Sequence, residues 1–236
     1  MKLKCIIFDV DGTMADTERD GHRVAFNRAF AEKGLDWQWH EKLYGQLLKV
    51  TGGKERIKYY QSDFIKKIIL NDAEIKQLHA CKTKHYVELL ESGKIPLRQG
   101  VKQLIEQANA LGIRLAIATT TTPINVSTLL KSTLGQNSEK KFDVIAAGDI
   151  VANKKPATDI YNYTLAHLGL NASDCIAIED SNAGLISATD AGIKTIIVSN
   201  NYTKNQDFSK AVLVKPNFAE INPNLLIQIT EGQVYV

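Results

Sequence analysis

The sequence lacks several features that would each define a class of protein. The three cysteines, Cys5, Cys81 and Cys175, are few, odd in number and far apart, which argues against a disulfide framework and against a Cys-x-x-Cys metal site. No run of apolar residues approaches the length that spans a membrane. The apolar run at residues 5–8 is also far too short for the core of a signal peptide. We therefore expect a cytoplasmic protein without a membrane partner.

An excess of charge of one sign is also missing. The 236 residues contain 29 Lys and Arg against 26 Asp and Glu, so the formal net charge is only +3. This balance argues against a nucleic acid or another polyanion as the partner. Hydrophobic residues make up 44% of the chain, which supports a buried core and argues against disorder. At roughly 150 residues per domain the length corresponds to about 1.6 domains, and one domain with a large insertion fits better than two full domains.

Two common nucleotide-binding motifs are absent as well. The P-loop pattern fails because Glu55 follows Gly53-Lys54 and Leu48 occupies the position of the first glycine. The pattern Gly-x-Gly-x-x-Gly does not occur either. The sequence therefore gives no fingerprint of a dinucleotide-binding or P-loop protein.

Short, continuous apolar runs recur along the chain and predict strands that are covered on both faces. These runs lie at residues 4–10, 113–119, 142–147, 175–178 and 194–199. Between them, helical spacing of apolar residues predicts helices at 101–111, 159–168 and 182–191, each followed by glycine. Alternating strands and helices predict an α/β fold with a Rossmann-like parallel sheet and helices on both faces.

One long segment interrupts this alternation. Residues 16–93 contain no comparable strand run, and their apolar positions predict several helices. Residues 91–96 have the composition of a linker. We therefore expect an α/β core formed by residues 1–15 and 94–236, with an inserted helical cap domain at 16–93.

Acidic residues follow two of the predicted strands. Asp9 and Asp11 end the first run, and Glu179 and Asp180 end a later one. The first pair could form an ordinary Asp-Gly turn, and Asp180 or Ser181 could cap the next helix. Parallel sheets bind ligands at the carboxyl ends of their strands, where four carboxylates would repel one another without a cation. Few, hard oxygen ligands favour Mg²⁺, which also binds substrate phosphate.

A hydroxyl and a lysine accompany these acids. Thr119 ends the second strand run, either as an ordinary turn residue or as a phosphate ligand. In Lys154-Lys155-Pro156 the proline predicts the first residue of a helix. A lysine just before a helix interacts unfavourably with the helix dipole, which costs about 0.3–1 kcal/mol. The alternative to a solvated lysine pair is that Lys155 balances the acids and holds a phosphate.

Taken in order, these motifs resemble the four motifs of the haloacid dehalogenase-like (HAD) hydrolase superfamily, and the inserted helices resemble its C1 cap. The motifs are Asp9-x-Asp11-Gly-Thr13, Thr119, Lys155-Pro156 and Glu179-Asp180. The residues around these motifs are similar to the beta-phosphoglucomutase-like group, and the segments 51–57 and 142–149 are most similar to the CbbY family. The resemblance implies a phosphatase that removes a phosphate from xylulose 1,5-bisphosphate.

The resemblance also implies roles for the motif residues. Asp9 would attack phosphorus and form an aspartyl-phosphate, and Asp11 would act as the general acid and then the general base. Thr119 and Lys155 would neutralise charge on the transferring phosphoryl group. The implied Mg²⁺ ligands are the carboxylates of Asp9 and Asp180, the backbone carbonyl of Asp11, and Glu179 directly or through water.

The cap is implied to contribute to substrate binding. The implied substrate-binding residues are Glu18, His22, Gly52, Gly53, Lys54 and Arg56 in the cap, and Thr120 in the core. Gly52-Gly53 could equally be a helix break flanked by solvated charges, and His22 a packed histidine. Trp37 and Trp39 are predicted to pack inside the cap.

The resulting prediction is a Mg²⁺-dependent phosphoric monoester hydrolase acting on a small sugar phosphate or bisphosphate. The alternatives are a beta-phosphoglucomutase, a phosphatase of another sugar phosphate or of phosphoglycolate, and a non-catalytic sugar-phosphate sensor. The intact pair Asp9 and Asp11 argues against the sensor. The expected partner is a phosphorylated sugar, and we expect the chain to act as a monomer.

Overall fold

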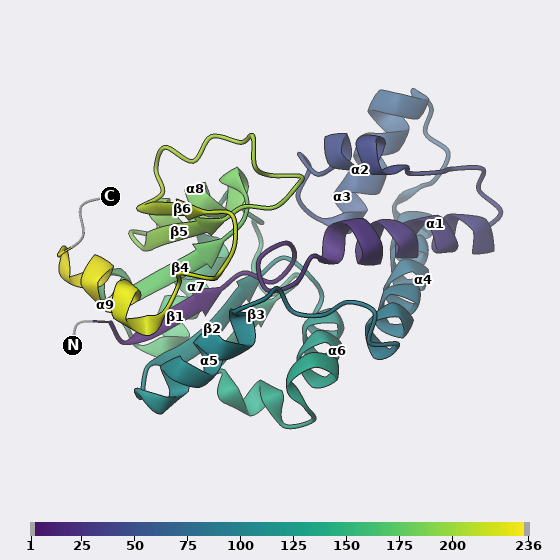
Figure 1. The fold of residues 1–236 in the computed structure, drawn as a ribbon. Helices are drawn as coiled ribbons and strands as arrows, with labels where there is room; N and C mark the ends of the chain where they lie inside the picture. Colours follow the sequence, from purple (N-terminus) through teal and green to yellow (C-terminus); the bar gives the residue numbers. More distant parts are fainter. Residues whose placement is uncertain (1–2, 234–236) are drawn as a thin grey trace. The chain divides into compact units, whose positions relative to one another are not determined.

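The computed structural model describes residues 3–233 and divides into two compact units. The α/β unit comprises Met1–Asp16 and Pro96–Val236, and the helical unit comprises Thr17–Ile95 (Figure 1). The helical unit is thus a continuous insertion directly after the first strand and its loop. The assignment of these units to the predicted core and cap domains stays a prediction.

A parallel sheet forms the centre of the α/β unit. Among the described residues it has six strands in the order β3-β2-β1-β4-β5-β6, and every neighbouring pair is parallel. The strands are β1 (Cys5–Phe8), β2 (Arg114–Thr119), β3 (Val144–Ala147), β4 (Cys175–Glu179), β5 (Lys194–Val198) and β6 (Leu213–Lys215). The five predicted runs correspond to β1 to β5, whereas β6 was not predicted. Because β1 lies between β2 and β4, its loop lies at the point where the strand order reverses, where sheets of this kind bind ligands.

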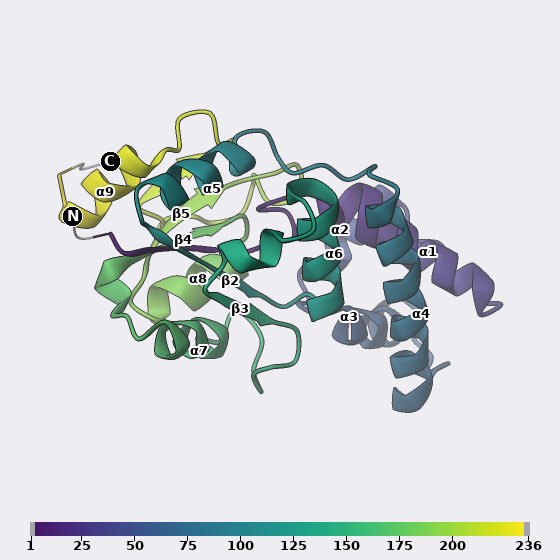
Figure 2. The ribbon, with the colours of Figure 1, turned by 90° about the horizontal axis from the view of Figure 1, so that it is seen from below.

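Helices cover both faces of this sheet. The α/β unit contains α5 (Val101–Ala110), α6 (Pro123–Leu134), α7 (Asp159–Leu168), α8 (Asn182–Asp190) and α9 (Pro223–Glu231), and the short helices η3 (Ser138–Lys141) and η4 (Ala172–Asp174). Helices α5 and α9 lie on one face, and α7 and α8 lie on the other (Figures 1 and 2). The predicted α/β fold with helices on both faces is confirmed.

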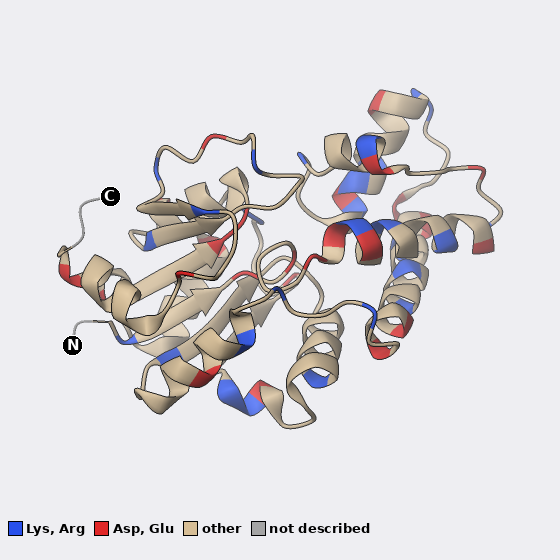
Figure 3. Cartoon of the chain, in the orientation of Figure 1, with Lys and Arg blue, Asp and Glu red and all other residues tan. Residues whose placement is uncertain are grey.

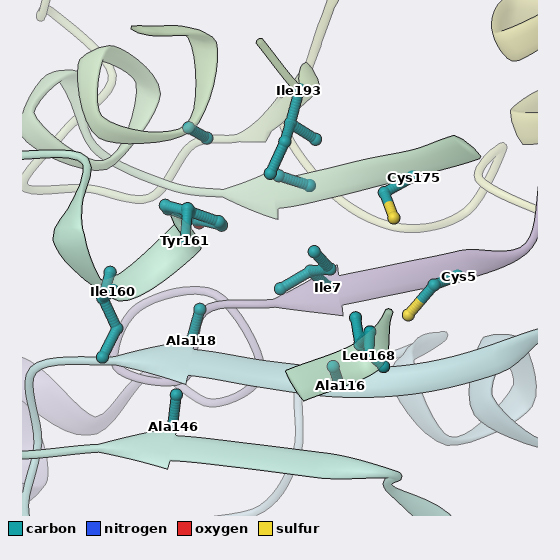
Figure 4. Close-up of a cluster of buried hydrophobic side chains, with 12 residues drawn as sticks. Cys5, Ile7, Ala116, Ala118, Ala146, Ile160, Tyr161, Leu168, Cys175 and Ile193 are labelled. Atoms are coloured by element: carbon teal, nitrogen blue, oxygen red, sulfur yellow. The ribbon is translucent and has the colours of Figure 1, made fainter. Parts of the chain in front are cut away.

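Side chains of one sheet face pack against α7 and α8 in a continuous core. Ile7 of β1 and Ala118 of β2 lie in this cluster with Ile160 and Tyr161 of α7 (Figure 4). Small alanines on the strands leave room for the larger side chains of the helices. Full burial of each isoleucine stabilises the fold by about 1.5–3 kcal/mol, so the core fixes the strand ends that carry the site.

The helical unit is built around a pair of packed helices, α1 and α4, and an aromatic cluster. Its elements are η1 (Glu18–His22), α1 (Arg23–Glu32), α2 (Glu41–Leu47), α3 (Gly53–Tyr59), η2 (Tyr60–Ile65) and α4 (Asp72–Glu91). Asn71 and Glu74 form a capping box that begins α4, and α1 packs along α4. Trp37 and Trp39 are buried against Phe30, so both tryptophans pack inside this unit as expected.

Charged residues of both signs are distributed over both units (Figure 3). The small net charge therefore does not arise from one acidic and one basic unit. No helix within residues 3–233 is both long enough and apolar enough to cross a membrane.

Candidate active site

The loop after β1 places Asp9 at the carboxyl edge of the sheet. The backbone N–H of Asp9 donates to Ile178 O of β4 at 3.0 Å, so this loop continues the strand pairing for one residue. Thr13 Oγ1 donates to Asp9 Oδ2 at 3.0 Å. The carboxylate of Asp9 is buried, and its position is fixed by its own loop.

Gly12 allows this loop to approach the end of β4 closely. Its φ is +85°, and a Cβ at this position would lie 2.4 Å from Asp180 Oδ2. Asn200 Nδ2 donates to the same oxygen at 2.6 Å. A side chain at position 12 would therefore be strained and would displace Asp180.

Lys155 joins the two acidic strand ends. Its Nζ lies 2.8 Å from Asp9 Oδ1 and 2.5 Å from Glu179 Oε1, and it donates to Ala118 O at 2.9 Å. All three charged side chains are buried. Helix α7 begins at Asp159, as the spacing of its apolar residues predicts. The interpretation of Pro156 as the first residue of a helix was therefore wrong. The lysine instead lies in an irregular segment before the helix and points toward the carboxylates.

Glu179 is held by residues from three elements. Tyr161 OH of α7 donates to Glu179 Oε1 at 2.7 Å, beside the Lys155 contact. A Cβ at Gly184 of α8 would lie 2.0 Å from Glu179 Oε2, so only glycine fits at that position. Ser181 is the N-cap of α8 and accepts from the Gly184 N–H. Asp180 is therefore not needed for capping and remains at the acidic edge.

The burial of these groups changes their protonation. Burial raises the pKa of Asp9 to about 7, against the opposing effect of Lys155. Burial alone would lower the pKa of Lys155, but the charges of Asp9 and Glu179 outweigh it and raise this pKa. Burial also raises the pKa of Tyr161 well above its ordinary value, with a further contribution from Glu179. Lys155 is thus a permanent cation, and Tyr161 a neutral hydrogen-bond donor.

The same edge offers ligands for a divalent cation. Asp9, Glu179 and Asp180 each provide a carboxylate oxygen, and these oxygens lie within 4.8 Å of one another. Lys155 supplies one positive charge to three buried carboxylates, which leaves an excess of negative charge. Hard oxygen ligands with an excess of negative charge fit Mg²⁺. Asp11 lies two residues after Asp9 in the same loop and is partly buried.

The predicted threonines lie at the end of the neighbouring strand. Thr119 is the last residue of β2 and is buried, and Thr120 follows it with partial exposure. The Thr119 hydroxyl accepts from the Thr121 N–H at 3.4 Å. Because β2 pairs with β1, both threonines belong to the same edge of the sheet as Asp9.

The predicted residues of the helical unit form two separate arrangements. Tyr44 OH donates to Glu18 Oε2 at 2.5 Å and accepts from Arg56 Nη1 at 2.8 Å. Arg56 Nη1 also lies 3.7 Å from Glu18 Oε2. Elsewhere, His22 Nδ1 contacts Lys82 Nζ at 2.6 Å. The structure thus joins Glu18 to Arg56, and His22 to a lysine that the sequence did not indicate.

The glycine pair lies at the beginning of α3. Gly52 is the N-cap with φ +96°, Gly53 is the first helical residue, and Lys54 follows it. The Arg56 N–H donates to Gly52 O at 3.0 Å. The pair therefore begins a helix rather than breaking one.

Several residues at these sites were not predicted. Asn200 follows β5 as a polar residue at a strand end, so the signal that identified Asp9 could also have identified it. Tyr44 and Lys82 lie on helices, where no comparable pattern marks them. Tyr161 lies on a predicted helix, and only the fold reveals its contact with Glu179.

The family profile of the haloacid dehalogenase-like hydrolases matches residues 6–198, which include Asp9, Thr119, Lys155, Glu179 and Asp180. The chain belongs to this family. The HAD hydrolases with which it aligns include the protein CbbY of Rhodobacter capsulatus, at 49% identity over 89% of this chain and 92% of that protein. The predicted similarity to CbbY is confirmed.

Solved structures of HAD hydrolases agree with this result. The crystal structure of CbbY from Rhodobacter sphaeroides in complex with phosphate superposes with a TM-score of 0.87 at 43% identity, covering 92% of this chain and 96% of that one. A variant of the same protein in complex with xylulose-(1,5)bisphosphate has a TM-score of 0.87 at 42% identity, with the same coverage of both chains. The chain is a phosphatase of the HAD family, as predicted.

Proposed function

We propose that this chain is a Mg²⁺-dependent phosphatase of a small phosphorylated sugar, with xylulose 1,5-bisphosphate as the first candidate substrate. The observation that carries the proposal is the buried Asp9 carboxylate, which is fixed by Thr13 and Lys155 beside Glu179. The complex of the similar CbbY from Rhodobacter sphaeroides with xylulose-(1,5)bisphosphate supports the candidate substrate.

In the first step Asp9 attacks the phosphorus atom of the ester. A bond forms between a carboxylate oxygen and phosphorus, and the bond from phosphorus to the sugar oxygen breaks. Asp11 donates a proton to the departing sugar oxygen. The products of this step are the sugar, with a hydroxyl group at the reacting position, and an aspartyl-phosphate on Asp9.

In the second step water hydrolyses the aspartyl-phosphate. Asp11, now a carboxylate, takes a proton from the attacking water, whose oxygen bonds to phosphorus. The bond between Asp9 and phosphorus breaks, which releases inorganic phosphate and regenerates both aspartates. Asp11 lies two residues after Asp9 in the same loop. This position allows Asp11 to act as the acid in the first step and as the base in the second.

The charges of the site favour transfer of an anionic group. Lys155 and the hydroxyl of Thr119 would bind oxygens of the transferring phosphoryl group, and Thr120 would contact the substrate. Asp9, Glu179 and Asp180 would hold the metal together with the backbone carbonyl of Asp11. When bound, Mg²⁺ would neutralise charge on the transferring phosphoryl group.

The helical unit would supply the specificity for a second phosphate. We assign this role to Arg56 and Lys54, with Gly52, Gly53, Glu18 and His22 as supporting residues. Arg56 is oriented by Tyr44 OH, to which Nη1 donates at 2.8 Å, and by Val50 O, which lies 3.4 Å from Nη2. A guanidinium also offers charge-assisted donors suited to phosphate. Replacing Arg56 with Gln should raise KM for the bisphosphate at least about tenfold, since one charge-assisted contact is lost. The same variant should change KM for the corresponding monophosphate much less; equal changes would contradict the assignment.

The central experiment measures release of inorganic phosphate from a panel of sugar phosphates, with Mg²⁺ and with EDTA. We expect release from xylulose 1,5-bisphosphate that EDTA abolishes, and no isomerisation of beta-glucose 1-phosphate. Isomerisation without phosphate release would identify a mutase, whereas tight binding without turnover would identify a sensor.

The nucleophile is tested by Asp9→Asn. This variant should lose at least about 10⁴-fold in kcat, because removing a nucleophile eliminates the covalent route. After acid quenching during turnover, peptide mass spectrometry should find one phosphoryl group on the Asp9 peptide of the unmodified enzyme. Full activity of Asp9→Asn, or a phosphoryl group on another residue, would contradict the assignment.

A further inference from the structure

A second group of potential metal ligands lies in the helical unit. Glu32 is the last residue of α1, and Cys81 and His85 belong to α4. Their ligand atoms, one carboxylate oxygen, one sulfur and one ring nitrogen, lie within 4.8 Å of one another. None of these residues belongs to the motifs that define the active site.

The packing of two helices creates this arrangement. Cys81 and His85 are four residues apart on α4, so their side chains lie on the same helix face. The end of α1 packs against that face and brings Glu32 Oε2 to 2.8 Å from His85 Nε2. Ligands from two helices, with two of them at i and i+4, are a frequent way to bind a metal on a helical scaffold.

A fourth residue orients the histidine. His85 Nδ1 lies 3.3 Å from Glu88 Oε2, one turn further along α4. Both ring nitrogens of His85 thus face carboxylates, and a metal at Nε2 would replace the hydrogen bond from Nε2 to Glu32 while Nδ1 donates to Glu88. Carboxylates that hold the second ring nitrogen are a regular feature of histidine metal ligands, where they fix the tautomer and the ring orientation.

The distances are near those of a tetrahedral site. Zinc–ligand bonds of about 2.0–2.3 Å place tetrahedral ligands roughly 3.3–3.8 Å apart. The widest pair would therefore have to close by about 1 Å at most, and Glu32 Oε2 and His85 Nε2, which lie 2.8 Å apart, would have to separate by about 0.5 Å. The side chain of Glu32 is 49% exposed and that of His85 16% exposed. The site is therefore open to solvent on one side, where a metal could enter and water could complete the shell.

We propose that Glu32, Cys81 and His85 bind one borderline-soft divalent cation, with Zn²⁺ as the type ion and water as the fourth ligand. Sulfur and imidazole together select such an ion over Mg²⁺, which prefers oxygen. When the sulfur–metal bond forms, the Cys81 thiol releases its proton to solvent. The bound ion would link the end of α1 to the middle of α4.

Cys81 is less suited to a role as a redox sensor. Burial, together with the carboxylate of Glu32, raises the pKa of its thiol. A redox-sensing cysteine needs the opposite shift, because the thiolate is the reactive form. The same carboxylate that disfavours the free thiolate would share the cation with it.

The proposal is tested with Co²⁺ and Zn²⁺ added to the full chain in excess Mg²⁺, which occupies the carboxylate site of the α/β unit. We expect one Co²⁺ per chain with thiolate-to-metal charge-transfer absorption, lost in Cys81→Ser and in His85→Gln. Glu88→Gln should weaken Zn²⁺ binding about 10- to 100-fold, since it removes the orienting carboxylate. The control variant His167→Gln, altered on the exposed face of α7, should bind like the unmodified protein.

A measurement on the unmodified protein avoids variants that fail to fold. Zn²⁺ should slow the alkylation of Cys81, followed by peptide mass spectrometry, and EDTA should restore the rate. Cys5 and Cys175 are buried in the sheet and serve as internal references. The absence of charge-transfer absorption, or equal alkylation with and without Zn²⁺, would overturn the proposal.

Discussion

At the scale of single residues, Lys155 determines how the buried acids can coexist. Its Nζ contacts both Asp9 and Glu179, and its third hydrogen bond goes to a backbone carbonyl. Two buried carboxylates on neighbouring strand ends would otherwise repel each other. One fixed cation therefore orders the proposed nucleophile and one candidate metal ligand together.

Replacing Lys155 with Met keeps the length of the side chain and removes its charge. We expect kcat to fall about 10²- to 10³-fold, because one charge that stabilises the phosphoryl group is lost. In EDTA the free energy of unfolding should fall by about 3–5 kcal/mol, since the buried carboxylates lose their partner. Steady-state kinetics and urea unfolding measure both effects. Lys102→Met, at a side chain that is 64% exposed, is the control, and equal behaviour of the two variants would refute this role.

At the scale of elements, Arg98 holds together the loops that follow three strands. Its guanidinium donates to Gly12 O at 2.7 Å, Val198 O and Ser199 O at 2.8 Å, and Pro216 O at 3.0 Å. Val198 is the last residue of β5, and the other three carbonyls belong to the loops after β1, β5 and β6. Arg98 is thus a positioning residue that acts through the loop of Asp9 and Asp11.

Arg98→Gln cannot span the four carbonyls, so the β1 loop should become less ordered. We expect kcat to fall about 10- to 100-fold, because small misplacements of reacting groups have effects of this size. The Mg²⁺ concentration for half-maximal activity should rise, whereas KM for the sugar should change little. The kcat of Arg98→Lys, which retains part of the hydrogen bonding, should lie between the kcat of the unmodified enzyme and that of Arg98→Gln. A variant that is only less stable, with kcat and Mg²⁺ dependence unchanged, would show a purely structural role.

The same scale shows what could be predicted from the sequence. Strands β1 to β5 were recognisable because each is covered by other elements and therefore continuously apolar. Strand β6 has one neighbour and only three residues, of which Leu213 alone is buried, so its pattern is too short to recognise. The acids at the strand ends were predictable because all strands run in parallel and end at the same edge.

Contacts between helices could not be predicted in this way. Helical periodicity shows which face of a helix is buried but not which helix covers it. The pair of His22 and Lys82 joins positions 60 residues apart, and Tyr44 joins Glu18 to Arg56. The cysteines gave a similar result: their wide spacing excluded a Cys-x-x-Cys site, but it could not indicate that α1 brings a glutamate to Cys81.

At the scale of the whole molecule, the small net charge does not reveal the local cluster of acidic residues. The chain is nearly neutral, yet Asp9, Glu179 and Asp180 gather at one edge with a single buried lysine. Such a cluster would lower the stability of the metal-free fold, and a bound cation would compensate for it. Stability should therefore depend on the metal.

Saturating Mg²⁺ should raise the melting temperature of the full chain by roughly 5–10 °C at 100 times its Kd, because a ligand that binds only the folded state stabilises it by about 2.7 kcal/mol. Differential scanning calorimetry with Mg²⁺ and with EDTA measures this shift, with Na⁺ at the same ionic strength as the control. Asp180→Asn should lose most of the shift. A shift that persists in this variant would locate the ion elsewhere.

The central place of β1 in the sheet has a consequence for how the protein is made. Asp9 is synthesised early, but its partner Lys155 follows 146 positions later, and β4 comes after that. Until then β1 lacks a neighbour on one side. The helical unit, by contrast, is one continuous segment, and it leaves the ribosome complete before β4 has been synthesised. During translation the helical unit is thus available to fold first, and Asp9 acquires its surroundings only after Lys155 and β4 have been synthesised.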